Sequence, residues 1–81
     1  MTNKLPSKNF LREQVTAALR EYFESLEGET VQDLYQLVLG EVEGPLLEIV
    51  MQYTDNNQSK AASWLGISRG TLRKLLDVYQ L

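Results

Sequence analysis

The stretch NQSKAASWLGISRGTLRKLL, residues 57–76, decides the fold, because two short amphipathic segments meet in it around a glycine. Asn57 can cap a helix that ends before Gly66, and this glycine can adopt the tight turn that must follow. Ser68 can cap a second helix that runs to about Tyr79. Two short helices joined by a glycine turn are typical of a helix-turn-helix, whose spacing can be tested.

Five residues stand where that motif needs them. A small residue is required where the two helices cross, glycine tolerates the left-handed backbone of the turn, and three larger apolar residues fasten the motif to the rest of the domain. Counted from Gln58 as position one, these residues are Ala62 at five, Gly66 at nine, Ile67 at ten, Leu72 at fifteen and Leu75 at eighteen. The spacing therefore predicts a helix-turn-helix over residues 55–81, with helices over 58–65 and 69–79.

Two longer helical segments precede the motif. Residues 10–26 repeat apolar side chains every three or four positions, as one face of an amphipathic helix does. A second helix is predicted to follow Thr30, which stands three residues before Asp33 in an approximate capping box, and to continue to Tyr53. Pro45 lies inside this segment, but the apolar stripe keeps its phase across the proline. We therefore predict one kinked helix instead of two.

The second helix is apolar over most of its circumference, and one short helix of the same chain cannot cover it. A chain of 81 residues is also near the lower size limit of a stable domain, and without cysteine it cannot form disulfides. A partner subunit can supply the missing contacts. We therefore predict an all-α, four-helix homodimer in which residues 10–54 are the dimerisation helices. The predicted interface residues are Leu11, Val15, Leu19, Tyr22, Phe23, Leu34, Leu37, Val38, Val42, Leu46 and Val50.

The composition argues against several classes of function. The absence of histidine and cysteine excludes the usual zinc sites, and no glycine-rich phosphate loop is present, so we expect no metal, no cofactor and no enzymatic activity. No apolar run approaches the ~20 residues of a membrane span. The first residues, MTNKLPSKNF, lack the apolar core of a secretory signal. We expect a cytoplasmic protein without membrane contact, in which residues 1–9 form a short flexible arm.

Charge is distributed unevenly along the chain, whose formal net charge is −3. Residues 1–54 carry four cations and nine acids, a balance of −5, whereas residues 55–81 carry four cations and two acids, a balance of +2. No acid stands between Asn56 and Leu76. This separation predicts that the helix-turn-helix faces an anionic partner.

The polar residues that the predicted motif leaves exposed suit double-stranded DNA. Arginine can hold O6 and N7 of guanine with two hydrogen bonds, serine and threonine reach phosphates or bases, and helix starts attract phosphate. The candidate DNA-binding residues are Asn57, Ser59 and Lys60 in the first helix of the motif or its cap, and Ser68, Arg69, Thr71, Arg73 and Lys74 in the second helix or its cap.

The runs LYQLVLGEVEGPLLEIVMQYT and NQSKAASWLGISRGTLRKLLDVY resemble the bacterial Fis family, the factor for inversion stimulation. The similarity extends from about Leu11 to Tyr79. It implies a homodimer whose first two helices intertwine and which presents two recognition helices to successive major grooves. It further implies that the protein bends DNA with an A/T-rich centre, that Arg69 reads guanines near the edges of the site, and that the protein acts in transcription regulation and nucleoid organisation.

The chain departs from the family pattern at several positions. Fis-like proteins commonly carry basic residues where this chain has Asp55, Leu75, Asp77 and Val78, and asparagine where it has Ser68. Fewer phosphate contacts weaken binding to all sequences alike. An alternative hypothesis is therefore a protein-interaction dimer that keeps the Fis fold with weak or lost DNA binding. Because the arm before the first helix is short, we do not expect contact with DNA invertases.

Overall fold

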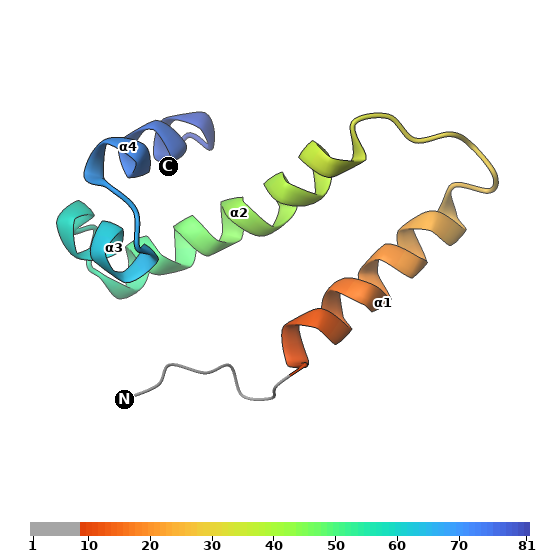
Figure 1. Ribbon diagram of the computed structural model, residues 1–81, viewed down its shortest axis with the longest axis horizontal. Helices are drawn as coiled ribbons and strands as arrows, with labels where there is room; N and C mark the ends of the chain where they lie inside the picture. The colour runs from red at the N-terminus through yellow and green to blue at the C-terminus, as the bar shows by residue number, and fades with distance from the viewer. Residues whose placement is uncertain (1–8) are drawn as a thin grey trace. The chain divides into compact units, whose positions relative to one another are not determined.

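The computed structural model describes residues 9–81, which divide into two units, residues 9–32 and 33–81 (Figure 1). The predicted arm over residues 1–9 lies, apart from Asn9, outside the described residues. Within the described range the chain contains no strand. Its four helices are α1 Phe10–Ser25, α2 Leu34–Tyr53, α3 Gln58–Leu65 and α4 Arg69–Val78. The predicted all-α class with four helices is confirmed.

Helix α1 is the only helix of the first unit within the described residues, and its bounds agree with the predicted 10–26 to within one residue. Its first backbone hydrogen bond runs from the N–H of Glu13 to the carbonyl of Asn9, at 2.9 Å. Gly28 adopts a left-handed φ of +86° just after the helix ends, a conformation that glycine reaches without steric cost. None of the residues of α1 is buried, so this unit leaves its apolar stripe uncovered.

The start of α2 differs from the prediction. Asp33 has a left-handed backbone, with φ 55° and ψ 34°, and its side chain makes no capping hydrogen bond. The helix begins at Leu34, and the N–H of Leu37 donates to the carbonyl of Asp33 at 3.0 Å. The prediction of a capping box at Thr30 was therefore wrong. A left-handed residue cannot belong to a right-handed helical turn, so Asp33 lies before the first turn and not inside it.

From Leu34 to Tyr53 helix α2 is continuous, with Pro45 inside it. Proline has no N–H to donate to the carbonyl four residues earlier, but the helix continues past this position. The prediction of one helix in preference to two is confirmed. After α2 the chain turns sharply through Asp55 and Asn56, both left-handed at φ 52° and 62°. The buried Thr54 secures this turn, because its hydroxyl donates to the carbonyl of Val50 at 2.9 Å.

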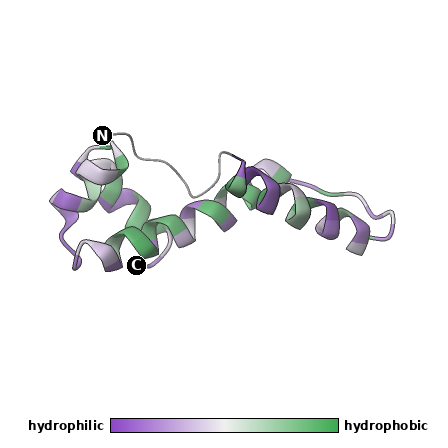
Figure 2. Ribbon diagram, turned by 90° about the horizontal axis from the view of Figure 1, so that it is seen from below, coloured by the Kyte–Doolittle hydropathy of each residue, from purple (hydrophilic) through white to green (hydrophobic). Residues whose placement is uncertain are grey.

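Helices α2, α3 and α4 share the core of the second unit. Hydrophobic and hydrophilic residues alternate along the helices, as amphipathic helices require (Figure 2). The core consists of Leu47 and Met51 from α2, Ala61 and Ala62 from α3, and Leu72 and Leu76 from α4. Ile67 and Leu75 are partly buried against it. The predicted packing roles of Ala62, Ile67, Leu72 and Leu75 are confirmed.

Tyr79, the residue that follows the last residue of α4, also contacts α2. Its hydroxyl donates to Oε1 of Glu43 at 2.7 Å. Its ring lies over Gly44, where an added Cβ would stand 3.4 Å from Cδ1 of the tyrosine. The bond to Glu43 and the partial burial both favour the neutral phenol and raise the pKa of Tyr79 above the ordinary 10.0. Because this pKa is higher in the folded state, the stability that the bond contributes is present at neutral pH and is lost only as the pH rises above 10.0, through the pKa of Tyr79.

We predict opposite effects for the same substitution at two glycines. Gly40→Ala should raise the free energy of unfolding by about 0.5–1 kcal/mol, because glycine is a poor helix former. A Cβ there would lie 3.9 Å from the Tyr79 hydroxyl, an ordinary contact. Gly66→Ala should lower the free energy of unfolding by about 1–2 kcal/mol, because φ is +74° at Gly66 and an L residue is strained there. Urea unfolding at one protein concentration measures both changes. Equal changes at the two positions would contradict these backbone assignments.

Candidate nucleic-acid interface

The first helix of the motif, α3, has the predicted bounds and the predicted cap. Asn57 is extended, and its Oδ1 accepts a hydrogen bond from the N–H of Lys60 at 3.0 Å. The helix ends at Gly66, whose left-handed backbone brings the N–H of Ile67 to the carbonyl of Ala62 at 3.1 Å. This hydrogen bond closes the end of the helix and directs the chain into α4.

The second helix, α4, is capped by Ser68 as predicted. Its Oγ accepts from the N–H of Thr71 at 3.1 Å and lies 2.9 Å from the Thr71 Oγ1, to which it donates. The cap therefore holds the Thr71 hydroxyl in place at the start of the helix. Arg69 is the first residue of α4, which ends at Val78, one residue before the predicted end.

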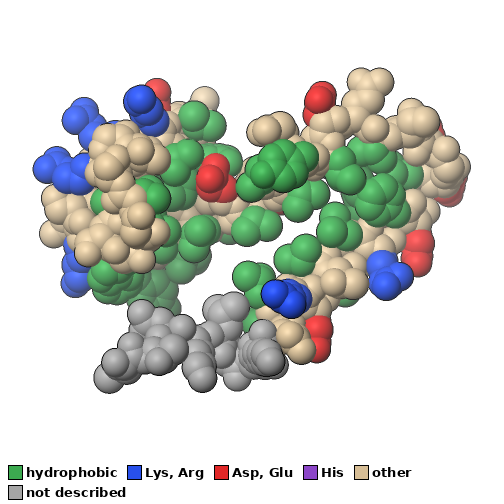
Figure 3. All heavy atoms as spheres, viewed as in Figure 1, with side chains coloured by type: hydrophobic (Ala, Val, Ile, Leu, Met, Phe, Trp, Pro, Cys, Tyr) green, Lys and Arg blue, Asp and Glu red, His purple; other side chains and the backbone are tan. Residues whose placement is uncertain are grey.

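All the candidate DNA-binding residues are exposed. Lysine and arginine side chains gather over α3 and α4 in the space-filling view (Figure 3). Three candidates lie at the start of α3 or in its cap, and five lie on α4 or in its cap; the full set is Asn57, Ser59, Lys60, Ser68, Arg69, Thr71, Arg73 and Lys74. The faces of α3 and α4 that point away from the core therefore form a cationic surface.

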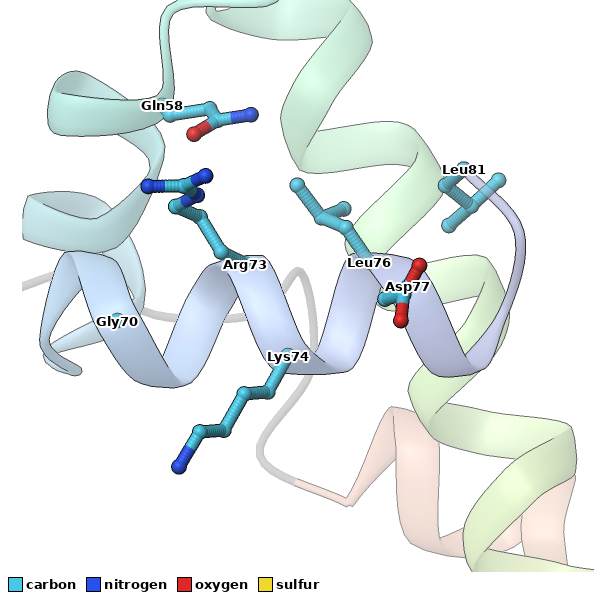
Figure 4. A pocket seen from close by; sticks show the side chains of 7 residues that line it. All are labelled: Gln58, Gly70, Arg73, Lys74, Leu76, Asp77 and Leu81. Carbon is cyan, nitrogen blue, oxygen red and sulfur yellow. The ribbon is translucent and has the colours of Figure 1, made fainter.

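An open groove of about 520 Å³ runs along α4 and reaches the start of α3. Arg73 extends from α4 toward Gln58 of α3, whereas Lys74 points to the other side of the helix (Figure 4). Asp77 stands one turn further along α4, at the end of the groove that Leu76 and Leu81 line. The groove thus brings cationic groups of α4 next to the polar start of α3, and it also contains one acid.

Lys60 has a neighbour that we did not anticipate from the sequence. Its Nζ lies 5.5 Å from the ring centroid of Trp64, which is close enough for a cation–π interaction. Trp64 is 58% exposed, so the pair lies on the surface of α3. The signal for it is present in the sequence, because residues four apart share one face of a helix.

Four of the positions that depart from the Fis pattern fall into two groups. Leu75 is partly buried against the core, so here an apolar residue contributes to packing. Asp55, Asp77 and Val78 are exposed. Asp55 lies in the left-handed turn that precedes α3, and Asp77 lies in the groove. The two acids therefore flank the cationic surface and oppose its field.

None of the predicted interface residues is buried in the described chain. Val50 packs partly against the core of its own unit, and the others lie on α1 and α2. Five of them, Leu11, Phe23, Leu37, Val42 and Leu46, are between 43% and 49% exposed. An exposed apolar series of this kind on two helices is available for contact with another surface.

Residues 9–81 contain neither a metal-binding cluster nor a membrane-spanning helix. No group of three or more His, Cys, Asp or Glu side chains in that range could hold a metal ion. No helix of the described chain is long and apolar enough to cross a membrane.

Comparison with known proteins agrees with this geometry. Residues 38–79 match the bacterial regulatory protein, Fis family. The chain is 58% identical over 69 residues to the DNA-binding protein Fis of Histophilus somni, and the match covers 85% of this chain and 70% of that protein. The DNA-binding protein Fis of Proteus mirabilis is 59% identical with the same coverage. The matched region includes the whole of α3 and α4.

Proposed function

The chain belongs to the Fis family of bacterial regulatory proteins, and we propose that it is a homodimeric protein that binds and bends DNA. Its role in this proposal is transcription regulation and nucleoid organisation in the bacterial cytoplasm. The observation that carries the proposal is the cationic surface of α3 and α4, whose caps and turn have the geometry of a helix-turn-helix. The relatives are named DNA-binding proteins, and we assign no catalytic role to this chain.

Within this proposal α4 is the recognition helix and enters the major groove. Arg69, at its start, is assigned to guanines near the edges of the site, because a guanidinium can donate two hydrogen bonds to one guanine. Thr71, Arg73 and Lys74 are assigned to the flanking phosphates and bases, and the start of α3 is assigned to the phosphate backbone. An A/T-rich centre is favoured because such sequences deform more readily where the protein makes no base contact.

We predict that Arg69→Ala reduces the discrimination between sites with and without an edge guanine by about 1–3 kcal/mol. Arg20→Ala is the matched control, since it removes the same charge from the exposed surface of α1. Competition binding with paired duplexes measures the discrimination directly. Unchanged relative affinities for Arg69→Ala would remove Arg69 from base reading.

The second subunit of the proposed dimer covers the apolar surfaces of α1 and α2. These surfaces are too apolar to remain in water on a monomer, and α1 buries none of its residues. Association of helices from two chains into one core is a common solution for domains of this size. Residues 10–54 are thus assigned to dimerisation and residues 55–81 to DNA binding.

We predict that the chain sediments at micromolar concentration with twice its monomer mass of 9.3 kDa. Leu46→Asp should shift the mass toward that of the monomer, because Leu46 is 49% exposed in the chain but would be buried in the interface. Gln36→Asp adds the same charge at an exposed polar position of α2 and should leave the dimer intact. A wild-type chain of monomer mass would contradict the proposed dimer.

We also predict that Asp77→Lys tightens binding to every duplex and steepens its salt dependence. One added phosphate contact per subunit should change the slope of log K against log salt by roughly 0.9 per contact. Glu29→Lys makes the same charge change in the turn before α2 and should have a much smaller effect.

Equal effects of Asp77→Lys and Glu29→Lys would place residue 77 away from the DNA backbone. The wild-type isotherms in the same experiment also test the alternative function. A dimer that binds no duplex even at low salt would be a Fis-fold interaction protein, in which the two acids beside the cationic surface have abolished binding.

A further inference from the structure

We propose that Tyr79 is a positioning residue that holds the recognition helix α4 in its DNA-binding orientation through its hydrogen bond to Glu43. This inference rests on the proposed function, since it concerns how the recognition helix is presented. Tyr79 itself is assigned no contact with DNA. Its contribution is to connect the end of α4 to the middle of α2, 36 positions earlier in the chain.

Two observations place Tyr79 against one narrow part of α2. Its hydroxyl donates to Oε1 of Glu43 at 2.7 Å, a charge-assisted bond of ordinary length. Its ring lies over the backbone of the same helix, because an ideal Cβ at Gly44 would be 3.4 and 3.6 Å from two ring carbons. A Cβ at Gly40 would be 3.9 Å from the hydroxyl oxygen. These distances are those of ordinary van der Waals contact, so the tyrosine lies directly against this turn of α2.

The other contacts of α4 do not define its orientation as strictly. Leu72 and Leu76 are buried in the core, but apolar packing is non-directional and allows a helix to tilt or slide slightly. A helix of ten residues is about 15 Å long, so a tilt of about 5° at its Tyr79 end would move its Arg69 end by about 1 Å. Two-point recognition of a guanine does not tolerate such a displacement well. A hydrogen bond at the far end of the helix restrains this tilt.

The position of Glu43 gives the bond a second consequence. Glu43 follows Val42 and stands three residues before Leu46, both of which are proposed interface residues and are 43% and 49% exposed. The same turn of α2 therefore has one side for the partner subunit and another for Tyr79. In the dimer, the separation of the two recognition helices would depend on how each α4 is held against this turn. We therefore expect the bond to affect site recognition and not only stability.

The experiment compares duplex binding by wild type, Tyr79→Phe, Glu43→Ala, Glu43→Gln and the double variant Tyr79→Phe/Glu43→Ala. Tyr79→Phe and Glu43→Ala should each weaken binding to an A/T-centred duplex with edge guanines by about three- to tenfold, as expected for the loss of one hydrogen bond. The double variant should be no weaker than either single variant, because both remove the same bond. Glu43→Gln keeps an acceptor oxygen and should bind within about twofold of wild type.

Charge alone predicts a different pattern. Both Glu43 variants remove one acid, so an effect of net charge would tighten binding equally in both. Tyr53→Phe is the matched control, since it removes the hydroxyl of a tyrosine that is 72% exposed at the end of α2, and it should bind like wild type. Without DNA, amide hydrogen exchange in α4 should be faster in Tyr79→Phe than in wild type, whereas the dimer mass should be unchanged.

Each outcome decides the inference. Wild-type affinity in Tyr79→Phe, or equal tightening by the two Glu43 variants, would overturn the positioning role while leaving DNA binding in place. Unchanged exchange in α4 would also overturn it, because the helix would then be held without the bond. A wild-type chain that binds no duplex would overturn the proposed function and this inference together, and the binding isotherm of the wild type distinguishes that case from the others.

Discussion

The recognition end of the chain depends on a close helix crossing that two small residues permit. Ala61 and Ala62 have 0% and 3% of their surface exposed, and their size lets α3 join one core with α2 and α4. A larger side chain at either position would push the helices apart and leave voids around Leu72, which is fully buried. The turn at Gly66 and the two side-chain caps can direct polar groups outward only while this crossing is maintained.

The fold also resolves the contrast between an acidic chain and an anionic partner. Most of the acids belong to α1 and α2 or to the turns beside them, whereas α3 and the first two turns of α4 contain none. Screening in physiological salt limits the reach of exposed charges to about 8 Å, so the local field of α3 and α4 matters more than the net charge of −3. Asp55 and Asp77 are the acids that stand beside this surface, and they moderate the attraction without reversing its sign.

Helix α2 serves two surfaces at once, and this explains its unusual composition. One part of its circumference supplies Leu47 and Met51 to the core of its own unit. Another part is apolar and exposed, which fits a helix that packs against a second subunit in the proposed dimer. Between them, Gly40, Glu43 and Gly44 receive Tyr79 from the end of α4. Because α2 contributes to the core on one side and, in the proposed dimer, faces a second subunit on another, most of its circumference is apolar.

The sequence by itself determined the features that depend on neighbouring residues. The bounds of α3, both motif caps and the turn at Gly66 follow from groups within about four positions of one another, and the exposed candidate residues follow from the helical period. The start of α2 was mispredicted because the left-handed backbone of Asp33 has no clear local signal. Only the tertiary structure decided that Tyr79 meets Glu43. The two residues are 36 positions apart, and their contact depends on how three helices pack around a shared core. The spacing of residues along the chain does not predict such a contact.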